Sequence, residues 1–146
     1  MKKIILAGFA ATVFAGAALA GAHGSMSDKR VAAMKEMGGA MKAISDVAKG
    51  NAAPSADTVA AAKKINMLAT NALEMFPEGS MEYRAKASIW SDWAGFKAAN
   101  DRLVAASADL VTATETMDAA KIGAALGATG KTCGGCHDDY RGPKPS

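Results

Sequence analysis

Apolar residues recur at every third or fourth position through four long stretches of this 146-residue chain, and this periodicity limits its fold more than any other feature. Residues three or four apart share one face of an α-helix, whereas a half-buried strand needs alternation at every second residue. The β-branched residues are scattered, and nowhere do four or more alternate with polar ones. The pattern therefore predicts an all-α protein.

Capping and helix-breaking residues divide the chain into four predicted helices. The first begins near Ser27 or Asp28 and ends before Gly50, the second follows Ser55 and ends at Pro77, the third begins between Met81 and Ser88 and runs to about Thr112, and the fourth follows a break at Thr114 to Thr116 and runs towards Tyr140. The predicted buried stripe of the first helix is Val31, Met34, Met37 or Gly38, Met41, Ile44 and Ala48. Short connections favour an antiparallel, up-down-up-down four-helix bundle.

Residues 1–20 have the features of a secretory signal peptide. Lys2 and Lys3 precede an apolar run, and overlapping A-x-A sites predict cleavage after Ala20 or Ala22. A retained membrane anchor is the alternative, but the apolar run is shorter than the ~20 residues that span a bilayer. We therefore expect one exported domain, residues 21–146, that is not inserted in a membrane.

Charge and cysteine content exclude several classes of protein. The net charge is +3, and the loss of Lys2 and Lys3 with the leader brings it close to neutral, so a nucleic-acid-binding protein is not expected. Two cysteines can close only one disulfide, which excludes a disulfide-rich scaffold.

The sequence Cys133-Gly-Gly-Cys136-His137 is a C-x-x-C-H motif, the attachment signature for c-type haem. On a helix the three reactive side chains share one face, so two thiols can bond to the haem while the imidazole reaches its iron. A zinc site is an alternative, but it needs four ligands, and the other histidine is His23 at the cleavage junction. A thioredoxin-like dithiol needs a strand-to-helix junction, which an all-α chain lacks.

The bundle topology predicts which residues share a level with His137. In an up-down-up-down bundle, the starts of the first and third helices lie at the same end as the ends of the second and fourth. Met34 or its neighbours, Phe76 and the cluster around Trp93 are therefore expected near the haem. Met41 lies ~10 Å along the first helix from Met34, so the two sulfur atoms cannot serve one iron.

These features together resemble the cytochrome c′ family, the class II c-type cytochromes. The resemblance covers the leader, the four helices, the segments Arg30 to Met34 (R-V-A-A-M), Leu73 to Pro77 (L-E-M-F-P), Ile89 to Trp93 (I-W-S-D-W) and Cys133 to Arg141, and the position of C-x-x-C-H close to the C-terminus. It implies a single covalent haem c, with thioether links at Cys133 and Cys136 and His137 as the proximal ligand. It also implies that Arg30 lies near a haem propionate and that Arg141 lies close to the proximal face.

Met34 occupies the position that matches the distal residue of the family. A ligating Met sulfur gives the low-spin members, which transfer electrons, whereas an unbound distal residue leaves a five-coordinate iron that binds nitric oxide or carbon monoxide. The resemblance to the low-spin pattern predicts a periplasmic electron carrier with redox-protein partners and no enzymatic turnover. Gas binding is the alternative, and the first two helices could also mediate a homodimer.

Overall fold

The chain folds into a bundle of long helices. The computed structural model describes residues 25–144, and the predicted leader and both cleavage positions lie outside them. The elements, in chain order, are α1 (Met26–Ala48), α2 (Ala56–Thr70), the 3₁₀ helix η1 (Ala72–Met75), α3 (Ser88–Ser91), α4 (Trp93–Glu115) and α5 (Ala119–Tyr140). Among these elements none has the length and apolarity that a membrane crossing requires.

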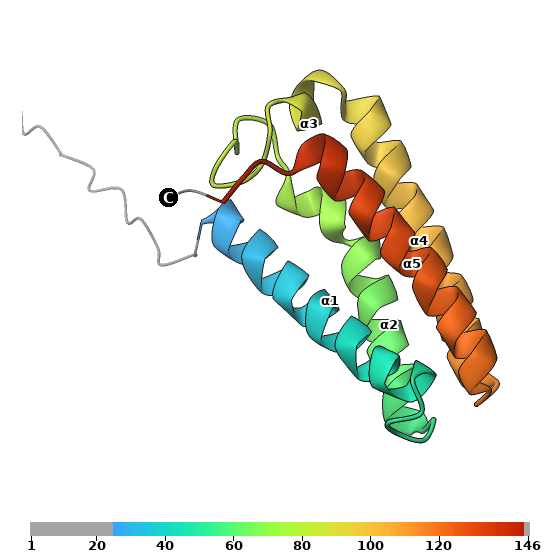
Figure 1. Cartoon of the computed structure of the whole chain (residues 1–146). Coiled ribbons are helices and arrows are strands. Elements are labelled where there is room, and N and C mark those ends of the chain that lie inside the picture. The colour runs from blue at the N-terminus through green and yellow to red at the C-terminus, as the bar shows by residue number, and fades with distance from the viewer. Residues whose placement is uncertain (1–24, 145–146) are drawn as a thin grey trace, which may run out of the picture.

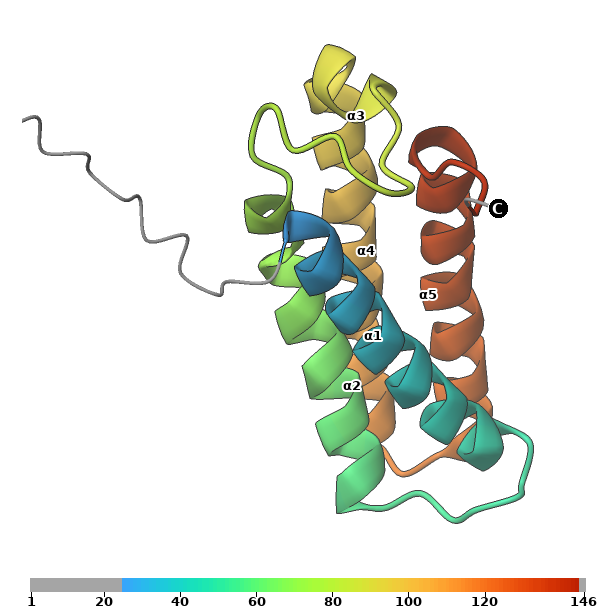
Figure 2. The same ribbon diagram turned by 90° about the vertical axis from the view of Figure 1, so that its left-hand side faces the viewer.

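Four of the helices run side by side, and the short α3 covers one end of the bundle (Figures 1 and 2). Each of α1 and α4 packs against α2, and each also packs against α5. The start of α1 and the end of α5 lie at the same end, as the predicted topology requires. The arrangement confirms the predicted all-α, antiparallel four-helix bundle.

Two predicted helix boundaries are wrong. The first helix begins at Met26 because Ser25, not Ser27 or Asp28, is the N-cap: Ser25 Oγ accepts the Asp28 amide at 3.2 Å, and the Asp28 carboxylate accepts the Ser25 amide at 3.1 Å. The second α-helix ends at Thr70, not at Pro77, and the chain continues as the 3₁₀ helix η1. A side chain of α4 stabilises the last turn of α2, since Asn100 Nδ2 donates to the Ala69 carbonyl at 3.2 Å.

The predicted third helix is in fact two helices. The backbone breaks at Asp92, whose side chain caps α4 by accepting the Gly95 amide at 3.1 Å. The same carboxylate accepts the Tyr140 hydroxyl of α5 at 3.0 Å. The partner of Asp92 is thus 48 residues away in the chain, which is why local periodicity does not reveal the break.

The predicted stripe of α1 divides between two faces of the helix. The buried residues are Arg30, Ala33, Met37, Ala40, Ile44 and Val47. From the predicted stripe only Met37 and Ile44 belong to this set. Val31, Met34, Gly38 and Met41 line a cavity, as Met37 also does, and Met41 packs against the core as well. The helix therefore presents one apolar face to the core and a neighbouring one to the cavity.

The core has two clusters at different levels of the bundle. An aliphatic cluster brings together Ala40, Ile44, Val47, Ala62, Ile65, Leu110 and Ile122 from four helices. An aromatic cluster at the α3 end contains Phe76, Ile89, Phe96, Ala99 and Tyr140, with Cys136 packed against it. Phe96 contacts Phe76 and Tyr140 edge-on, with ring centroids 4.8 and 5.1 Å apart.

The Asp92–Tyr140 bond leaves no room for a side chain at Gly95. A Cβ built there would overlap the Asp92 carboxylate and would lie 2.6 Å from Tyr140 Oη. We expect Gly95→Ala to lower the free energy of unfolding by about 1–3 kcal/mol through this overpacking. Urea denaturation of the purified protein measures the change.

Gly127→Ala is the matched control for this prediction. Gly127 lies in α5, and a Cβ there would meet nothing within 4 Å. Its replacement should raise the free energy of unfolding by about 0.5–1 kcal/mol, since alanine is the better helix former. Equal stability of the two variants would contradict the steric argument.

Candidate haem site

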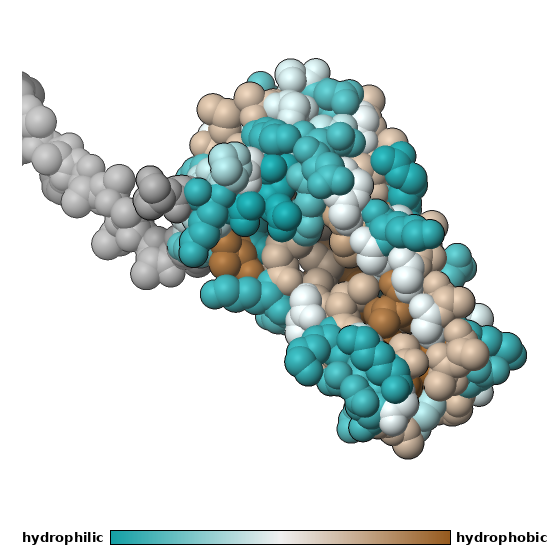
Figure 3. Space-filling view, in the orientation of Figure 1, coloured by the Kyte–Doolittle hydropathy of each residue, from teal (hydrophilic) through white to brown (hydrophobic). Residues whose placement is uncertain are grey.

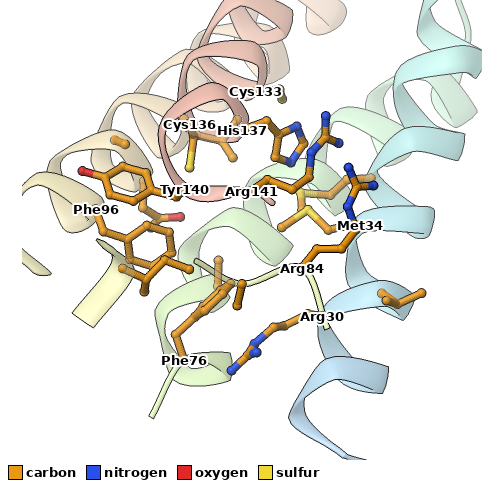
Figure 4. Close-up of a pocket in the computed structure, with 18 of the residues that line it drawn as sticks. Arg30, Met34, Phe76, Arg84, Phe96, Cys133, Cys136, His137, Tyr140 and Arg141 are labelled. Atoms are coloured by element: carbon orange, nitrogen blue, oxygen red, sulfur yellow. The ribbon is translucent and has the colours of Figure 1, made fainter. Parts of the chain in front are cut away.

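The C-x-x-C-H motif lies in the last two turns of α5 and faces a cavity of about 510 Å³. Cys133, Cys136 and His137 are all partly buried, all line the cavity, and neither cysteine is in a disulfide. Figure 4 shows them along one side of the helix. The helical spacing therefore brings two thiols and one imidazole together on one wall, as the sequence predicts.

Contacts between α1 and α5 show which residues of the two helices lie at the same level. A Cβ added at Gly123 would lie 3.5 Å from the Cβ of Ala48, and one added at Gly130 would lie 3.9 Å from Met41 Cε. A step of seven residues towards the start of α1, from Ala48 to Met41, thus corresponds to a step of seven residues towards the end of α5, from Gly123 to Gly130. The next step of seven pairs Met34 with His137, and both side chains line the cavity between their helices (Figure 4).

The cavity exists because α1 and α5 diverge. The two helices approach each other near the end of α1 and lie apart near the end of α5 (Figures 1 and 2). On the face shown in Figure 3, apolar side chains gather in the hollow between the two helices, and polar side chains surround it. Met34 is 37% exposed at this level, so the helices alone do not bury it.

The surroundings of the imidazole and of the two thiols favour their neutral forms. Burial lowers the pKa of His137, and the cations of Arg141 and Arg84 lower it further. The Asp138 carboxylate opposes this shift, and the net effect favours the neutral imidazole, the form that offers a lone pair to a metal. Burial raises the pKa of both thiols, that of Cys136 also through Cys133 and Asp139, so the environment disfavours the thiolates that zinc sites and dithiol oxidoreductases use.

Arg30 forms part of the cavity wall near the start of α1. Its guanidinium is buried, donates from Nε to the Met75 carbonyl at 2.7 Å and from Nη2 to Ser80 Oγ, and lies 4.4 Å from the centroid of Phe76. Burial lowers its pKa, and the nearby Glu82 carboxylate opposes that shift. Among the described residues, Nη1 has no hydrogen-bond partner although it is buried.

Of the remaining predicted site residues, Phe76 and Arg141 line the cavity and Trp93 does not. Phe76 is buried in the aromatic cluster. Trp93 is 40% exposed, and its ring centroid lies 5.7 Å from that of Phe96. The break at Asp92 places Trp93 at the first position of α4, so the expectation that it lies beside the haem has no support in this geometry.

Several cavity residues do not stand out in the sequence. Tyr140 and Phe96 line the cavity on the side of the aromatic cluster. Glu82, Tyr83 and Arg84 line it from the loop before α3. The spacing of four from Cys136 to Tyr140 could have indicated that both share one face of α5. Nothing local distinguishes residues 82–84, because their position depends on contacts with the end of the chain: Gly142 donates to the Arg84 carbonyl at 2.7 Å.

These residues fit a haem in volume and in donor chemistry. The cavity volume falls within the ~300–1,000 Å³ typical of cofactor sites. A Cβ at Gly38, in the cavity wall, would meet nothing within 4 Å. The buried donor at Arg30 Nη1 would suit an anionic acceptor such as a haem propionate, and the thiols and imidazole are those of C-x-x-C-H attachment.

A four-helix bundle with C-x-x-C-H facing an apolar cavity defines a haem-binding bundle of the c type. Comparison with known proteins specifies the family, because the family model described as Cytochrome C′ matches residues 25–141. The chain belongs to the cytochrome c′ family and is a haem protein of electron transfer or gas binding.

Individual relatives agree with this assignment. Cytochrome c-556 of Agrobacterium tumefaciens (strain B2A) is 38% identical over 118 residues, which cover 78% of this chain and 94% of the relative. Cytochrome c′ of Rhodospirillum rubrum is 33% identical and covers 96% of this chain and 97% of its own. The crystal structure of cytochrome c′ from Rubrivivax gelatinosus superposes with a TM-score of 0.70 at 34% identity, covering 77% of this chain and 91% of its own.

The contacts of Arg30 predict a measurable loss of stability when its guanidinium is removed. Arg30→Met keeps the aliphatic stem but leaves the Met75 carbonyl without its donor. We expect the free energy of unfolding to fall by about 1–3 kcal/mol, as for other hydrogen bonds to charged groups. Lys29→Met, at an exposed neighbouring position of α1, is the control; urea unfolding that does not separate the two variants would contradict the assignment.

Proposed function

We propose that this protein is a periplasmic electron carrier that binds one haem covalently through Cys133 and Cys136, with His137 and Met34 as axial ligands. The observation that supports the proposal is the register of α1 against α5: extended by seven residues beyond Met41 and Gly130, it predicts that Met34 faces His137 across the cavity that both line. The leader in residues 1–20 supports export, since haem attachment of this type takes place outside the cytoplasm.

The haem supplies an iron that cycles between the ferric and ferrous states. The residues of the chain then determine how it is held. His137 would ligate the iron from α5, and the soft thioether of Met34 would favour the ferrous state from α1. The aromatic cluster gives the cavity an apolar side, and Arg30 would present a donor to a carboxylate of the haem.

Gas binding is the second candidate function. Solved structures of cytochrome c′ variants from Alcaligenes xylosoxidans include a nitric oxide complex that superposes with a TM-score of 0.76 at 28% identity, covering 81% of this chain and 94% of its own. A carbon monoxide complex superposes equally well. If Met34 lies beside the iron unbound, the cavity that holds its side chain is where such a gas would bind.

Covalent attachment is tested by removing the thiols. Because each thiol would form one thioether link, the double variant Cys133→Ala, Cys136→Ala should lose all covalent haem, and each single variant should retain a weaker, single attachment. Intact-mass spectrometry of the denatured protein measures the mass of one haem per chain. Thr132→Ala, next to the motif, should keep it. A haem increment in the double variant would contradict the proposed links.

The spin state separates the two candidate functions. A reduced wild-type protein with sharp, split α and β absorption bands and slow or absent carbon monoxide binding supports ligation by Met34. Met34→Ala should then become high-spin and bind carbon monoxide rapidly, because the sixth ligand is gone. A wild-type protein that is already high-spin would favour gas binding.

Two methionine variants control this experiment. Met67→Ala, exposed on α2, should leave the spectrum unchanged. Met41→Ala tests the register, since Met41 opposes Gly130 and lies ~10 Å along α1 from Met34. A loss of low-spin character in Met41→Ala, with none in Met34→Ala, would show that the ligand has been assigned to the wrong turn.

A further inference from the structure

The segment Ser80 to Ala87, here called the strap, crosses the bundle end between the start of α1 and the end of α5 (Figures 1 and 2). It follows Pro77 and leads into α3. Three of its residues, Glu82, Tyr83 and Arg84, line the cavity. The strap therefore lies against both helices that carry the proposed axial ligands, at the level where the cavity separates them.

At α5 the strap binds carbonyl groups that the helix leaves without partners. The last carbonyls of a helix have no amide one turn ahead of them. Lys86 Nζ donates to the Asp138 carbonyl at 2.9 Å and to the Asp139 carbonyl at 3.1 Å, and the Lys86 amide donates to the Tyr140 carbonyl at 3.1 Å. Asp138 directly follows His137, so Lys86 binds the turn that holds the imidazole.

Backbone pairing beyond the helix end adds to this attachment. Ala85 and Arg141 form an isolated antiparallel bridge, Gly142 donates its amide to the Arg84 carbonyl at 2.7 Å, and Arg84 Nε donates to the Gly142 carbonyl at 2.8 Å. These bonds hold residues 140–142 beside the strap. The end of α5 is thus attached to the strap by polar contacts, in addition to the packing of Tyr140 and Cys136 in the aromatic cluster.

At α1 the same segment holds the first turns. Glu82 accepts the Ser27 amide at 3.2 Å, and Ser80 Oγ accepts from Arg30 Nη2. Ser27 and Arg30 precede Met34 on the same helix. A single short segment therefore bonds to α1 just before Met34 and to α5 just after His137.

We propose that the strap sets the separation of α1 and α5 at the haem, and that Lys86 is a positioning residue that fixes His137 and raises the reduction potential of the iron. This inference rests on the proposed function. Because the ammonium of Lys86 lies at the carbonyl end of α5, it offsets the partial negative charge of that helix terminus. A positive charge here opposes the ferric state, which carries one more positive charge than the ferrous state.

The test compares three variants of the haem-loaded protein. Lys86→Met keeps the aliphatic stem and loses the charge and both side-chain hydrogen bonds, whereas Lys86→Arg keeps the charge and its donors. Lys97→Met is the matched control, since Lys97 pairs only with Asp101, four residues along α4, among the described residues. The measurements are the midpoint potential, the absorption spectrum of the reduced protein, and amide hydrogen exchange at Arg141 and Gly142.

We expect Lys86→Met to have a lower midpoint potential than the wild type and about tenfold faster exchange at Arg141 and Gly142, because the end of α5 loses two charge-assisted bonds. Lys86→Arg should restore both quantities, and Lys97→Met should change neither. The potential difference should shrink at high salt, because screening weakens a partly exposed charge.

A change in exchange alone, with the potential and spectrum of the wild type, would overturn the positioning role, because it would show a structural contact only. Equal potentials in Lys86→Met and Lys97→Met would overturn it as well. A wild-type protein without covalent haem would overturn the proposed function together with this inference. If the wild type carries covalent haem but Lys86→Met has the midpoint potential of the wild type, this inference alone is overturned.

Discussion

The close approach of α1 and α5 at Ala48 and Gly123 is the contact on which the rest of the molecule depends. A Cβ added at Gly123 would be in van der Waals contact with that of Ala48, at 3.5 Å, and Met41 lies at Gly130 one step of seven further along. Extending this antiparallel register by another seven residues puts Met34 at the level of His137. From that contact the helices diverge towards the α3 end (Figure 1). Divergence opens the cavity, and register decides which side chains face each other across it. A different register would place another methionine, or none, opposite the imidazole.

An open bundle end cannot be held by apolar packing between α1 and α5, because the cavity removes those contacts. Polar bonds replace them. Arg30 joins α1 to the end of η1, Lys86 joins the strap to α5, and Tyr140 joins α5 to the cap of α4 at Asp92. The aromatic cluster provides the apolar packing at this end of the bundle. Two of these groups, Arg30 and Tyr140, also line the candidate haem site, so a change in either is expected to alter both stability and site geometry.

Much of this architecture follows from local pattern. The helical period, the caps and Pro77 predict four helices, and the spacing of Cys133, Cys136 and His137 places them on one face of the last helix. The errors arise where a distant partner decides the local structure. At the break, Asp92 accepts a hydrogen bond from the distant Tyr140, and Trp93, which follows the break, is not among the residues that line the cavity. The two apolar faces of α1 merge in a single stripe in the sequence, because period alone cannot tell a core face from a cavity face.

Local chemistry along the chain thus specified the helices, their polarity in the bundle and the reactive triad of α5, since each depends on residues within one or two turns of one another. Three-dimensional packing decided the level at which α1 meets α5, the size of the cavity, the position of Glu82, Tyr83 and Arg84 in its wall, and the attachment of Lys86 to the end of α5. These features depend on contacts between residues 50 or more positions apart. No periodicity encodes such contacts, because they form only when the bundle closes.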